Sequence, residues 1–132
     1  MAYDQNPSSA EDQAPVRTVL VVEDEEELGA FIVQALQQET PYQALFVTDG
    51  FQALKMVRSL KPNLFLLDFH LPSMDGIELY DQLRADEELE GIPVVMFTAD
   101  APTPELQERE IIFVEKPAEL DELLQTIRKV LG

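Results

Sequence analysis

The sequence predicts an α/β fold: a doubly wound, five-stranded parallel sheet with helices on both faces. Two observations carry this prediction. Short apolar runs alternate along the chain with segments of helical period from residue 17 onward. The runs are β-branched or bulky and lack the polar–apolar alternation of a strand with one face in water. Strict alternation of strands and helices is typical of parallel strands joined by right-handed crossovers.

Five short stretches, four or five residues long and apolar except for Thr18, mark the expected strands. They cover residues 18–22, 44–47, 64–67, 94–97 and 111–114. Because none of them alternates in polarity, we expect every strand to be buried on both faces between two layers of helices.

Periodic apolar stripes and start signals mark the helices. The first stripe with the spacing of one helix face is Leu28, Phe31, Ile32, Ala35 and Leu36. The same spacing recurs at the C-terminus in Leu120, Leu123, Leu124, Ile127 and Leu131. A second helix, over residues 51–60, follows Asp49, which suits an N-cap. A third, over about 77–88, follows Gly76.

A fourth helix is expected to be shortened or irregular. Residues 102–110 contain one large apolar side chain, Leu106, and no amphipathic stripe. Thr103 suits the N-cap of such a helix, and Pro104 suits its first helical position. These signals predict a helix of about two turns.

The first sixteen residues differ in composition from the rest of the chain. They are polar and acidic, and they lack both the charged start and the apolar stretch of a secretion signal. We therefore predict a disordered acidic tail at residues 1–16 and one folded domain at residues 17–132. A chain of 132 residues has the usual length of about one domain.

The charge balance excludes some classes of partner. Nine Lys and Arg residues against 26 Asp and Glu residues give a net charge of −17. Direct binding to nucleic acid needs clustered cations, and anionic membrane surfaces repel such a chain. The longest apolar runs have four residues, far below the ~20 of a membrane-spanning helix. The absence of cysteine excludes disulfides and fits a cytoplasmic location.

Polar side chains follow four of the five predicted strands. Glu23 and Asp24 follow the first strand and Asp68 follows the third. Thr98 and Lys116 follow the fourth and fifth. Because the carboxyl ends of parallel strands meet at one edge of a sheet, we expect these side chains to lie close together. Three carboxylates at one edge repel one another, and oxygen ligands without thiolates favour Mg²⁺ as the compensating cation.

Each of these residues also has an ordinary structural interpretation. Glu23 and Asp24 could cap the helix that follows them, and Asp68 could belong to a turn. Thr98 could simply end a strand, and Lys116 could be a solvated surface charge. Only the gathering of all five residues at one edge of the sheet favours a functional site.

Four segments of the chain, with the spacings between them, resemble one known family. They are VLVVEDE at 19–25, LFLLDFHLPSMDG at 64–76, VVMFTA at 94–99 and FVEKP at 113–117. Asp68 is 44 residues after Asp24, 30 before Thr98 and 8 before Gly76. In their order and spacing, these segments resemble the bacterial response-regulator receiver domain, over about residues 17–131.

The resemblance implies a flavodoxin-like strand order, 2-1-3-4-5, and a role in two-component signalling or a phosphorelay. Asp68 would be the phosphoacceptor, taking a phosphoryl group from a sensor histidine kinase or a histidine phosphotransfer protein. Asp24 and Asp68 would bind Mg²⁺ directly, Glu23 through water, and His70 through its backbone carbonyl. The chain would be a signalling switch that acts on a downstream protein, and not an enzyme with a separate substrate.

The same resemblance implies roles for the other residues at this edge. Lys116, the Thr98 hydroxyl and the Ala99 amide would bind the phosphoryl oxygens. Thr98 would move toward the phosphoryl group and Phe113 would fill the space it leaves, so these two residues would form the switch. The peptide bond between Lys116 and Pro117 would be cis.

The chain departs from the family pattern before the fifth strand. Thr98 and Lys116 are only 18 residues apart, a few fewer than in a typical receiver. Glu110 and Ile111 replace the Gly-Ala pair that is usual there. This departure puts in doubt dimerisation through the face made by the fourth helix, the fifth strand and the fifth helix.

Two other functions stay open from the sequence alone. A Mg²⁺-dependent aspartyl phosphohydrolase would use the same nucleophile, but His70 stands where such an enzyme has its second Asp. A receiver fold could also serve as a binding module without phosphorylation. Such a module need not keep the three acids, Thr98 and Lys116, and their presence counts against it.

Overall fold

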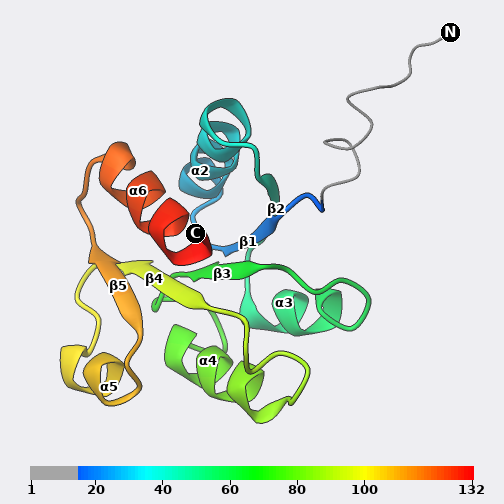
Figure 1. The fold of residues 1–132 in the computed structure, drawn as a ribbon. Helices are drawn as coiled ribbons and strands as arrows, with labels where there is room; N and C mark the ends of the chain where they lie inside the picture. The colour runs from blue at the N-terminus through cyan, green and yellow to red at the C-terminus, as the bar shows by residue number, and fades with distance from the viewer. Residues whose placement is uncertain (1–14) are drawn as a thin grey trace, which may run out of the picture.

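Five parallel strands form one sheet in the computed structural model of this protein, which describes residues 15–132 (Figure 1). The strands are β1 (Thr18–Val22), β2 (Gln43–Val47), β3 (Leu64–Leu67), β4 (Val94–Thr98) and β5 (Ile112–Glu115). Their order in the sheet is β2-β1-β3-β4-β5. The predicted parallel sheet and its strand order are therefore confirmed.

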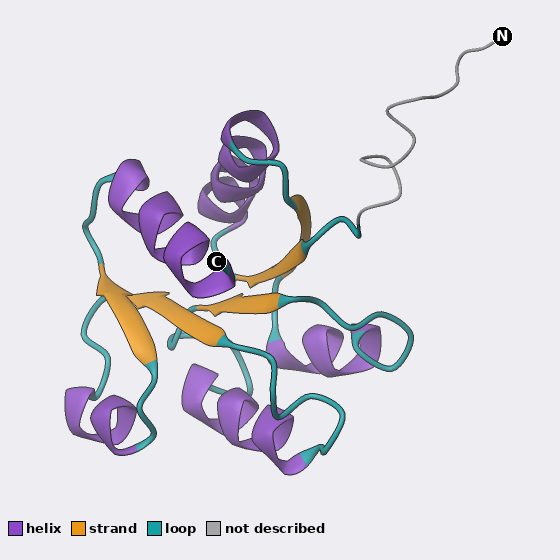
Figure 2. Cartoon of the chain, viewed as in Figure 1, coloured by secondary structure: helices purple, strands orange, loops and turns teal. Residues whose placement is uncertain are grey.

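A helix lies between each pair of successive strands and another follows the last one. The helices of the described residues are α2 (Glu26–Glu39), α3 (Gly50–Met56), α4 (Gly76–Ala85), α5 (Thr103–Glu108) and α6 (Leu120–Leu131). Helices α2 and α6 cover one face of the sheet, and α3, α4 and α5 cover the other (Figures 1 and 2). None of these helices is long and apolar enough to span a membrane.

The predicted tail at residues 1–16 lies outside the described residues except for its last two. Pro15 and Val16 are exposed and precede β1 without regular secondary structure. The division into a tail and a domain stays a prediction.

The central strands are apolar on both faces because each face meets a layer of helices. Side chains alternate between the two faces along a strand. In β1, Val19 and Val21 pack in the core beneath α2 and α6, whereas Leu20 and Val22 pack in the core beneath α3 and α4. The strand predictions for the centre of the sheet are confirmed.

The two outer strands correct the expectation that all five strands are buried on both faces. Ile112 in β5 is 47% exposed, and Leu45 and Phe46 in β2 are only half-buried. An outer strand has a neighbouring strand on one side only, so the rest of the fold covers it less completely. The apolar runs therefore located β2 and β5 correctly, but they overstated how deeply these strands are buried.

Two helices end earlier than the sequence predicts. Helix α3 ends at Met56 and not near residue 60, because the N–H groups of Arg58 and Ser59 bond only three residues back, to the Lys55 and Met56 carbonyls. Helix α4 ends at Ala85 and not at residue 88, because Asp86 takes an extended conformation and begins a turn. Each helix begins one residue before the expected start, at Gly50 and Gly76, and Asp49 caps α3 through a 2.8 Å bond from the Gln52 N–H.

Helix α5 has six residues, so the predicted short fourth helix is confirmed. The prediction of its N-cap is wrong by one residue. The Pro102 carbonyl accepts the first helical hydrogen bonds, from the N–H groups of Glu105 and Leu106, so Pro102 is the N-cap and Thr103 is already helical. The Thr103 hydroxyl contacts the Ala101 carbonyl and caps no helical N–H group.

The C-terminal end of α5 closes in a Schellman motif. The Ile111 N–H donates to the Leu106 carbonyl over 2.9 Å, and the Glu110 N–H donates to the Gln107 carbonyl over 3.0 Å. Leu106 and Ile111 are both buried in the core beneath the helix. Glu110 has a φ of 57°, the left-handed conformation that such an end requires and that glycine adopts most easily.

Replacing Glu110 with glycine is therefore expected to stabilise the fold. The left-handed conformation costs an L residue roughly 1–2 kcal/mol, and the extra flexibility of unfolded glycine offsets part of the gain. We expect Glu110→Gly to raise the free energy of unfolding by about 1 kcal/mol in a urea titration. Glu110→Ala keeps a Cβ atom and should give no such gain. Equal stabilities of the two variants would contradict this explanation.

Polar contacts also hold the end of α5 against α4. The Arg109 guanidinium binds the Asp81 carboxylate through two bonds, of 2.8 and 3.0 Å. The Tyr80 hydroxyl donates to the Arg109 carbonyl over 3.3 Å. The hydrogen bond from Arg109 and the charge of Arg109 lower the pKa of Asp81. The short helix is thus fixed by a buried leucine and by polar bonds to its neighbour.

Candidate functional site at the carboxyl ends of the strands

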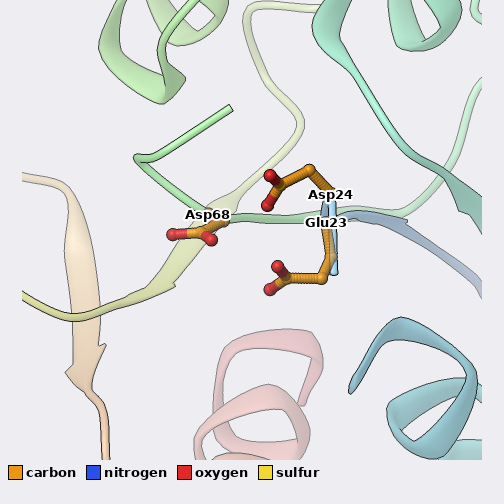
Figure 3. A group of neighbouring side chains, drawn as sticks. All are labelled: Glu23, Asp24 and Asp68. Atoms are coloured by element: carbon orange, nitrogen blue, oxygen red, sulfur yellow. The ribbon is translucent and has the colours of Figure 1, made fainter. Parts of the chain in front are cut away.

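Three carboxylates converge at the carboxyl end of the sheet (Figure 3). Glu23 and Asp24 follow β1, and Asp68 follows the adjacent strand β3. One carboxylate oxygen from each lies within 4.8 Å of one from each of the others. Glu23 and Asp68 are buried, whereas Asp24 is exposed. The three acids thus lie close together, as predicted, and could hold a cation between them.

Strand pairing brings these acids together. Val22 and Leu67 are register partners in β1 and β3, so the residues that follow them are side by side. The Asp68 N–H continues the pairing with a 3.1 Å bond to the Val22 carbonyl.

The structure excludes helix capping as the reason for these acids. The N-cap of α2 is Glu25, and no side chain caps that helix. Glu23 instead accepts a 3.1 Å bond from the Glu25 N–H through Oε2, while its other oxygen faces Lys116. Asp24 is likewise not the N-cap residue.

Lys116 reaches the acids from the end of β5. Its Nζ atom lies 3.1 Å from Glu23 Oε1 and 3.4 Å from Asp68 Oδ2. The side chain is only 20% exposed, and its ammonium lies 5.2 Å from the centre of the Phe97 ring. The Lys116–Pro117 peptide bond is cis. Lys116 is therefore part of the acidic cluster and not a solvated surface charge.

The charges of the cluster do not balance. Burial raises the pKa of Glu23 from 4.5 to about 7, and the charge of Asp68 adds to this rise, although bonds from Glu25 and Lys116 oppose it. Burial opposes the charge of Lys116 too, but the hydrogen bond to Glu23 and the negative charges of Asp68 and Glu23 raise its pKa. Three carboxylates thus face one ammonium, an arrangement that a bound divalent cation would stabilise.

The raised pKa of Glu23 predicts how stability depends on pH without metal. The native protein holds this proton to higher pH than the unfolded chain, so the stabilisation is complete below about pH 4.5 and is lost as pH rises through 7. Across this window the wild type should lose up to about 3 kcal/mol relative to Glu23→Gln, which cannot ionise. Urea titrations of both proteins between about pH 5 and pH 8 measure this difference. Parallel pH profiles would contradict the raised pKa.

Thr98 and Ala99 lie at the end of β4, beside the cluster. Thr98 is fully buried, and its hydroxyl lies 3.3 Å from the Ala99 carbonyl oxygen. The Thr98 carbonyl accepts a 2.9 Å bond from the Lys116 N–H. The next residue, Asp100, has a φ of 54° and turns the chain toward α5. The pairing of β4 with β5 thus continues to the residue that carries the ammonium, and a role of the Thr98 hydroxyl beyond ending the strand stays a proposal.

His70 contacts both Asp68 and the loop after β4. Its backbone N–H donates to Asp68 Oδ1 over 3.2 Å, and the Nε2 atom of its ring lies 2.9 Å from the Ala99 carbonyl oxygen. The residue is exposed at the mouth of the site. Use of the His70 carbonyl as a metal ligand stays a proposal.

Comparison with known proteins identifies the family. The model of the response regulator receiver domain matches residues 19–128 of this chain. The chain belongs to the response regulator receiver domain family. A receiver domain is a signalling domain and not an enzyme that turns over a separate substrate, so the phosphohydrolase alternative is wrong.

Individual relatives agree with this assignment. The DNA-binding response regulator MtrA of Mycolicibacterium smegmatis is 38% identical over 114 residues, which are 83% of this chain and 48% of MtrA. The chain thus spans about half the length of the MtrA proteins that it matches. The polar-differentiation response regulator DivK of Brucella anthropi is 31% identical over 122 residues, 88% of this chain and 97% of DivK.

Solved structures show the same fold. The signal receiver domain of a LuxO repressor protein from Vibrio parahaemolyticus is 28% identical, with a TM-score of 0.80 over 89% of this chain and 91% of that one. A CheY-like receiver domain protein from Methanospirillum hungatei has a TM-score of 0.81, covers 89% and 94% of the two chains, and is 23% identical.

Phe113 lies on β5 of this receiver domain, on the face that α5 covers. It is half-buried, it is the register partner of Met96 in β4, and it packs against the core on that side. A half-buried ring at this place could be a switch, as the resemblance implies, but it could equally be an ordinary side chain of the core. Its role as a switch stays a proposal.

Two features of the site escaped the sequence analysis. One is the contact of the His70 ring with Ala99, which no local sequence pattern predicts because 29 residues separate the two. The other is the capping box of α4, in which Asp75 and Glu78 bind each other's N–H groups. The Asp-x-x-Glu spacing before an apolar stripe could have revealed it.

Proposed function

We propose that this receiver domain accepts a phosphoryl group on Asp68 from a histidine kinase or a histidine phosphotransfer protein and passes the signal to a downstream protein. The observation that carries the proposal is the setting of Asp68. Its carboxylate is buried and lies beside those of Glu23 and Asp24. One of its oxygens accepts a bond from the Lys116 ammonium, and the other accepts a bond from the backbone N–H of His70.

The reaction is a transfer of the phosphoryl group between two nucleophiles. An oxygen of Asp68 forms a bond to phosphorus while the bond from phosphorus to the imidazole nitrogen of the phosphohistidine breaks. The electron pair of that bond goes to the nitrogen, and the histidine leaves as neutral imidazole because its other ring nitrogen carries a proton. The product is an acyl phosphate on Asp68. Lys116 already lies beside the Asp68 oxygens and meets the negative charge that the phosphoryl group brings.

The acids fit a divalent cation, and we propose Mg²⁺. Asp24 and Asp68 would bind it directly, Glu23 through a water molecule and His70 through its carbonyl. The fit rests on the donor set, which consists of oxygens only, and on the excess of three carboxylates over the one ammonium of Lys116. When bound, Mg²⁺ neutralises the acids and offsets the charge of a phosphoryl oxygen.

Three groups would hold the remaining phosphoryl oxygens. The Lys116 ammonium, the Thr98 hydroxyl and the Ala99 N–H lie around the carboxyl ends of β4 and β5. Thr98 must leave the Ala99 carbonyl to reach a phosphoryl oxygen. That turn empties space beside β5, and Phe113 would move inward to fill it. Phosphorylation would thus shift the population between two packings of this face.

We propose that the domain passes its signal on by contact with another protein in the cytoplasm. The net charge of −17 opposes direct binding to nucleic acid and to anionic membranes. MtrA is described as a DNA-binding response regulator, but this chain matches about half of MtrA, and DNA binding is not part of the proposal. The downstream partner is therefore proposed to be a protein.

Incubation with Mg²⁺ and acetyl phosphate, a small acyl phosphate donor, tests the function. We expect the wild type to gain the mass of one phosphoryl group in intact-mass spectrometry, because its own residues supply the nucleophile and the charge stabilisation. Asp68→Asn should gain none, since the amide replaces the nucleophilic carboxylate at nearly unchanged size. Removal of Mg²⁺ with a chelator should also abolish the gain. Equal phosphorylation of Asp68→Asn and wild type would refute the assignment.

A further inference from the structure

The ring of His70 makes a contact that the proposed phosphoryl transfer does not use. Its Nε2 atom lies 2.9 Å from the carbonyl oxygen of Ala99. A carbonyl oxygen only accepts hydrogen bonds, so Nε2 carries the hydrogen and donates it. The side chain thus joins the loop after β3 to the loop after β4.

Other contacts limit where this ring can go. The His70 N–H is bound to Asp68 Oδ1 over 3.2 Å, which fixes the backbone from which the ring extends. The ring of Phe69 meets the imidazole edge to face, with 4.9 Å between ring centres. A single residue therefore connects the proposed phosphoacceptor to the carbonyl of Ala99.

The loop after β4 depends on contacts of this kind. Two successive carbonyls are held from outside the loop, that of Thr98 by the Lys116 N–H and that of Ala99 by His70. The next residue, Asp100, has a φ of 54°, a left-handed conformation that few residues with a side chain adopt, although Asp adopts it more readily than most. The two bonds therefore fix the backbone that leads into this turn.

Thr98 and His70 share the Ala99 carbonyl. The Thr98 hydroxyl donates to it over 3.3 Å and the His70 ring over 2.9 Å. When Thr98 turns to a phosphoryl oxygen, the first of these bonds is lost. Among the described contacts, His70 is then the donor that keeps this half-buried carbonyl hydrogen-bonded.

We propose that His70 is a positioning residue, whose imidazole holds the Ala99 peptide in place for phosphoryl binding and replaces the Thr98 hydroxyl as its partner when Thr98 turns. Both parts rest on the proposed function, whereas the tether between the two loops exists before phosphorylation. His70 acts through Ala99 and does not contact the phosphoryl group.

Two variants separate the hydrogen bond from the volume of the side chain. His70→Leu fills similar space without a donor, and His70→Gln carries an amide nitrogen at about the distance of Nε2 from the backbone. Both keep the backbone N–H that binds Asp68. In the unphosphorylated protein we expect amide hydrogen exchange at residues 99–101 to be about threefold faster in His70→Leu than in wild type. His70→Gln should exchange at nearly the wild-type rate.

The state of the wild-type ring gives a test that needs no variant. A long-range ¹H–¹⁵N spectrum shows which ring nitrogen carries the proton in neutral imidazole, and we expect Nε2. A proton on Nδ1 would overturn the tether. Unchanged exchange at residues 99–101 in His70→Leu would overturn it as well.

The rate of phosphorylation by acetyl phosphate at saturating Mg²⁺ tests the positioning role. We expect His70→Leu to react about threefold more slowly than wild type and His70→Gln to recover most of the rate. Faster exchange in His70→Leu with an unchanged rate would overturn the positioning role. If Asp68→Asn is inert while His70→Leu behaves as wild type throughout, the tether is wrong and the proposed function stands. If Asp68→Asn reacts normally, the proposed function fails, and the exchange data still decide the tether.

Discussion

In metal-free buffer at about pH 8, Asp68→Asn is expected to melt at a higher temperature than the wild type. At this pH Glu23 is ionised, since its pKa is about 7. Asp68 is then buried beside two negative charges, with Lys116 as its one nearby cation. Asparagine removes the charge and keeps an oxygen for the His70 N–H. We expect a gain of about 1–2 kcal/mol, or about 5 °C for a domain of this size.

Mg²⁺ is expected to stabilise the wild type more than Asp68→Asn, because the variant lacks one of the three carboxylates. A ligand at ten times its Kd adds about 1.4 kcal/mol to the free energy of unfolding. Thermal melts with and without Mg²⁺ measure both effects. Glu87→Gln is the matched control, since Glu87 is an exposed acid beyond the end of α4. This variant should change neither the melting temperature nor its increase when Mg²⁺ is added. No gain in Asp68→Asn together with equal responses to Mg²⁺ would contradict the three-carboxylate site.

Gly76→Ala is expected to destabilise the fold strongly. A Cβ atom at this position would lie 2.5 Å from the Asp68 carbonyl oxygen and 2.8 Å from the Phe69 Cα. Both are backbone atoms, so neither a rotamer change nor a small shift relieves the overlap. The start of α4 would have to move away from the strand end that carries the phosphoacceptor. We expect a loss of about 2–3 kcal/mol in urea titration, which exceeds what alanine gains in a helix.

Gly91→Ala is the matched control for this substitution. Nothing lies within 4 Å of a Cβ atom built on Gly91. Its stability should stay within about 0.5 kcal/mol of wild type. Gly76→Ala should also react more slowly with acetyl phosphate, because Asp68 is displaced. Equal stabilities of the two variants would show that the start of α4 has room for a methyl group beside the Asp68 backbone.

The sequence carried enough information to place the strands and the candidate site. A run such as 64–67 is apolar throughout because both faces of β3 are covered, and this pattern is hard to produce in another way. Once parallel strands were predicted, topology alone brought Glu23, Asp24 and Asp68 to one edge. These predictions rested on properties that short stretches of sequence contain.

Contacts between residues far apart in the chain could not be predicted. The bond from His70 to Ala99 spans 29 residues and the bond from Arg109 to Asp81 spans 28. Neither pair has a spacing that a helix or a strand dictates. The exposure of Ile112 was missed for a similar reason, because an apolar run does not reveal whether its strand lies at the centre or the edge of the sheet.

Locating the phosphoryl group on the chain tests the central proposal most directly. Borohydride reduces an acyl phosphate to the alcohol, so a phosphorylated aspartate becomes homoserine, which tandem mass spectrometry assigns to one residue. After incubation with Mg²⁺ and acetyl phosphate, we expect homoserine at position 68 and none at position 24, which serves as an internal control. Homoserine at another acid, or its absence from position 68 in protein that has gained the phosphoryl mass, would contradict the assignment of Asp68 as the phosphoacceptor.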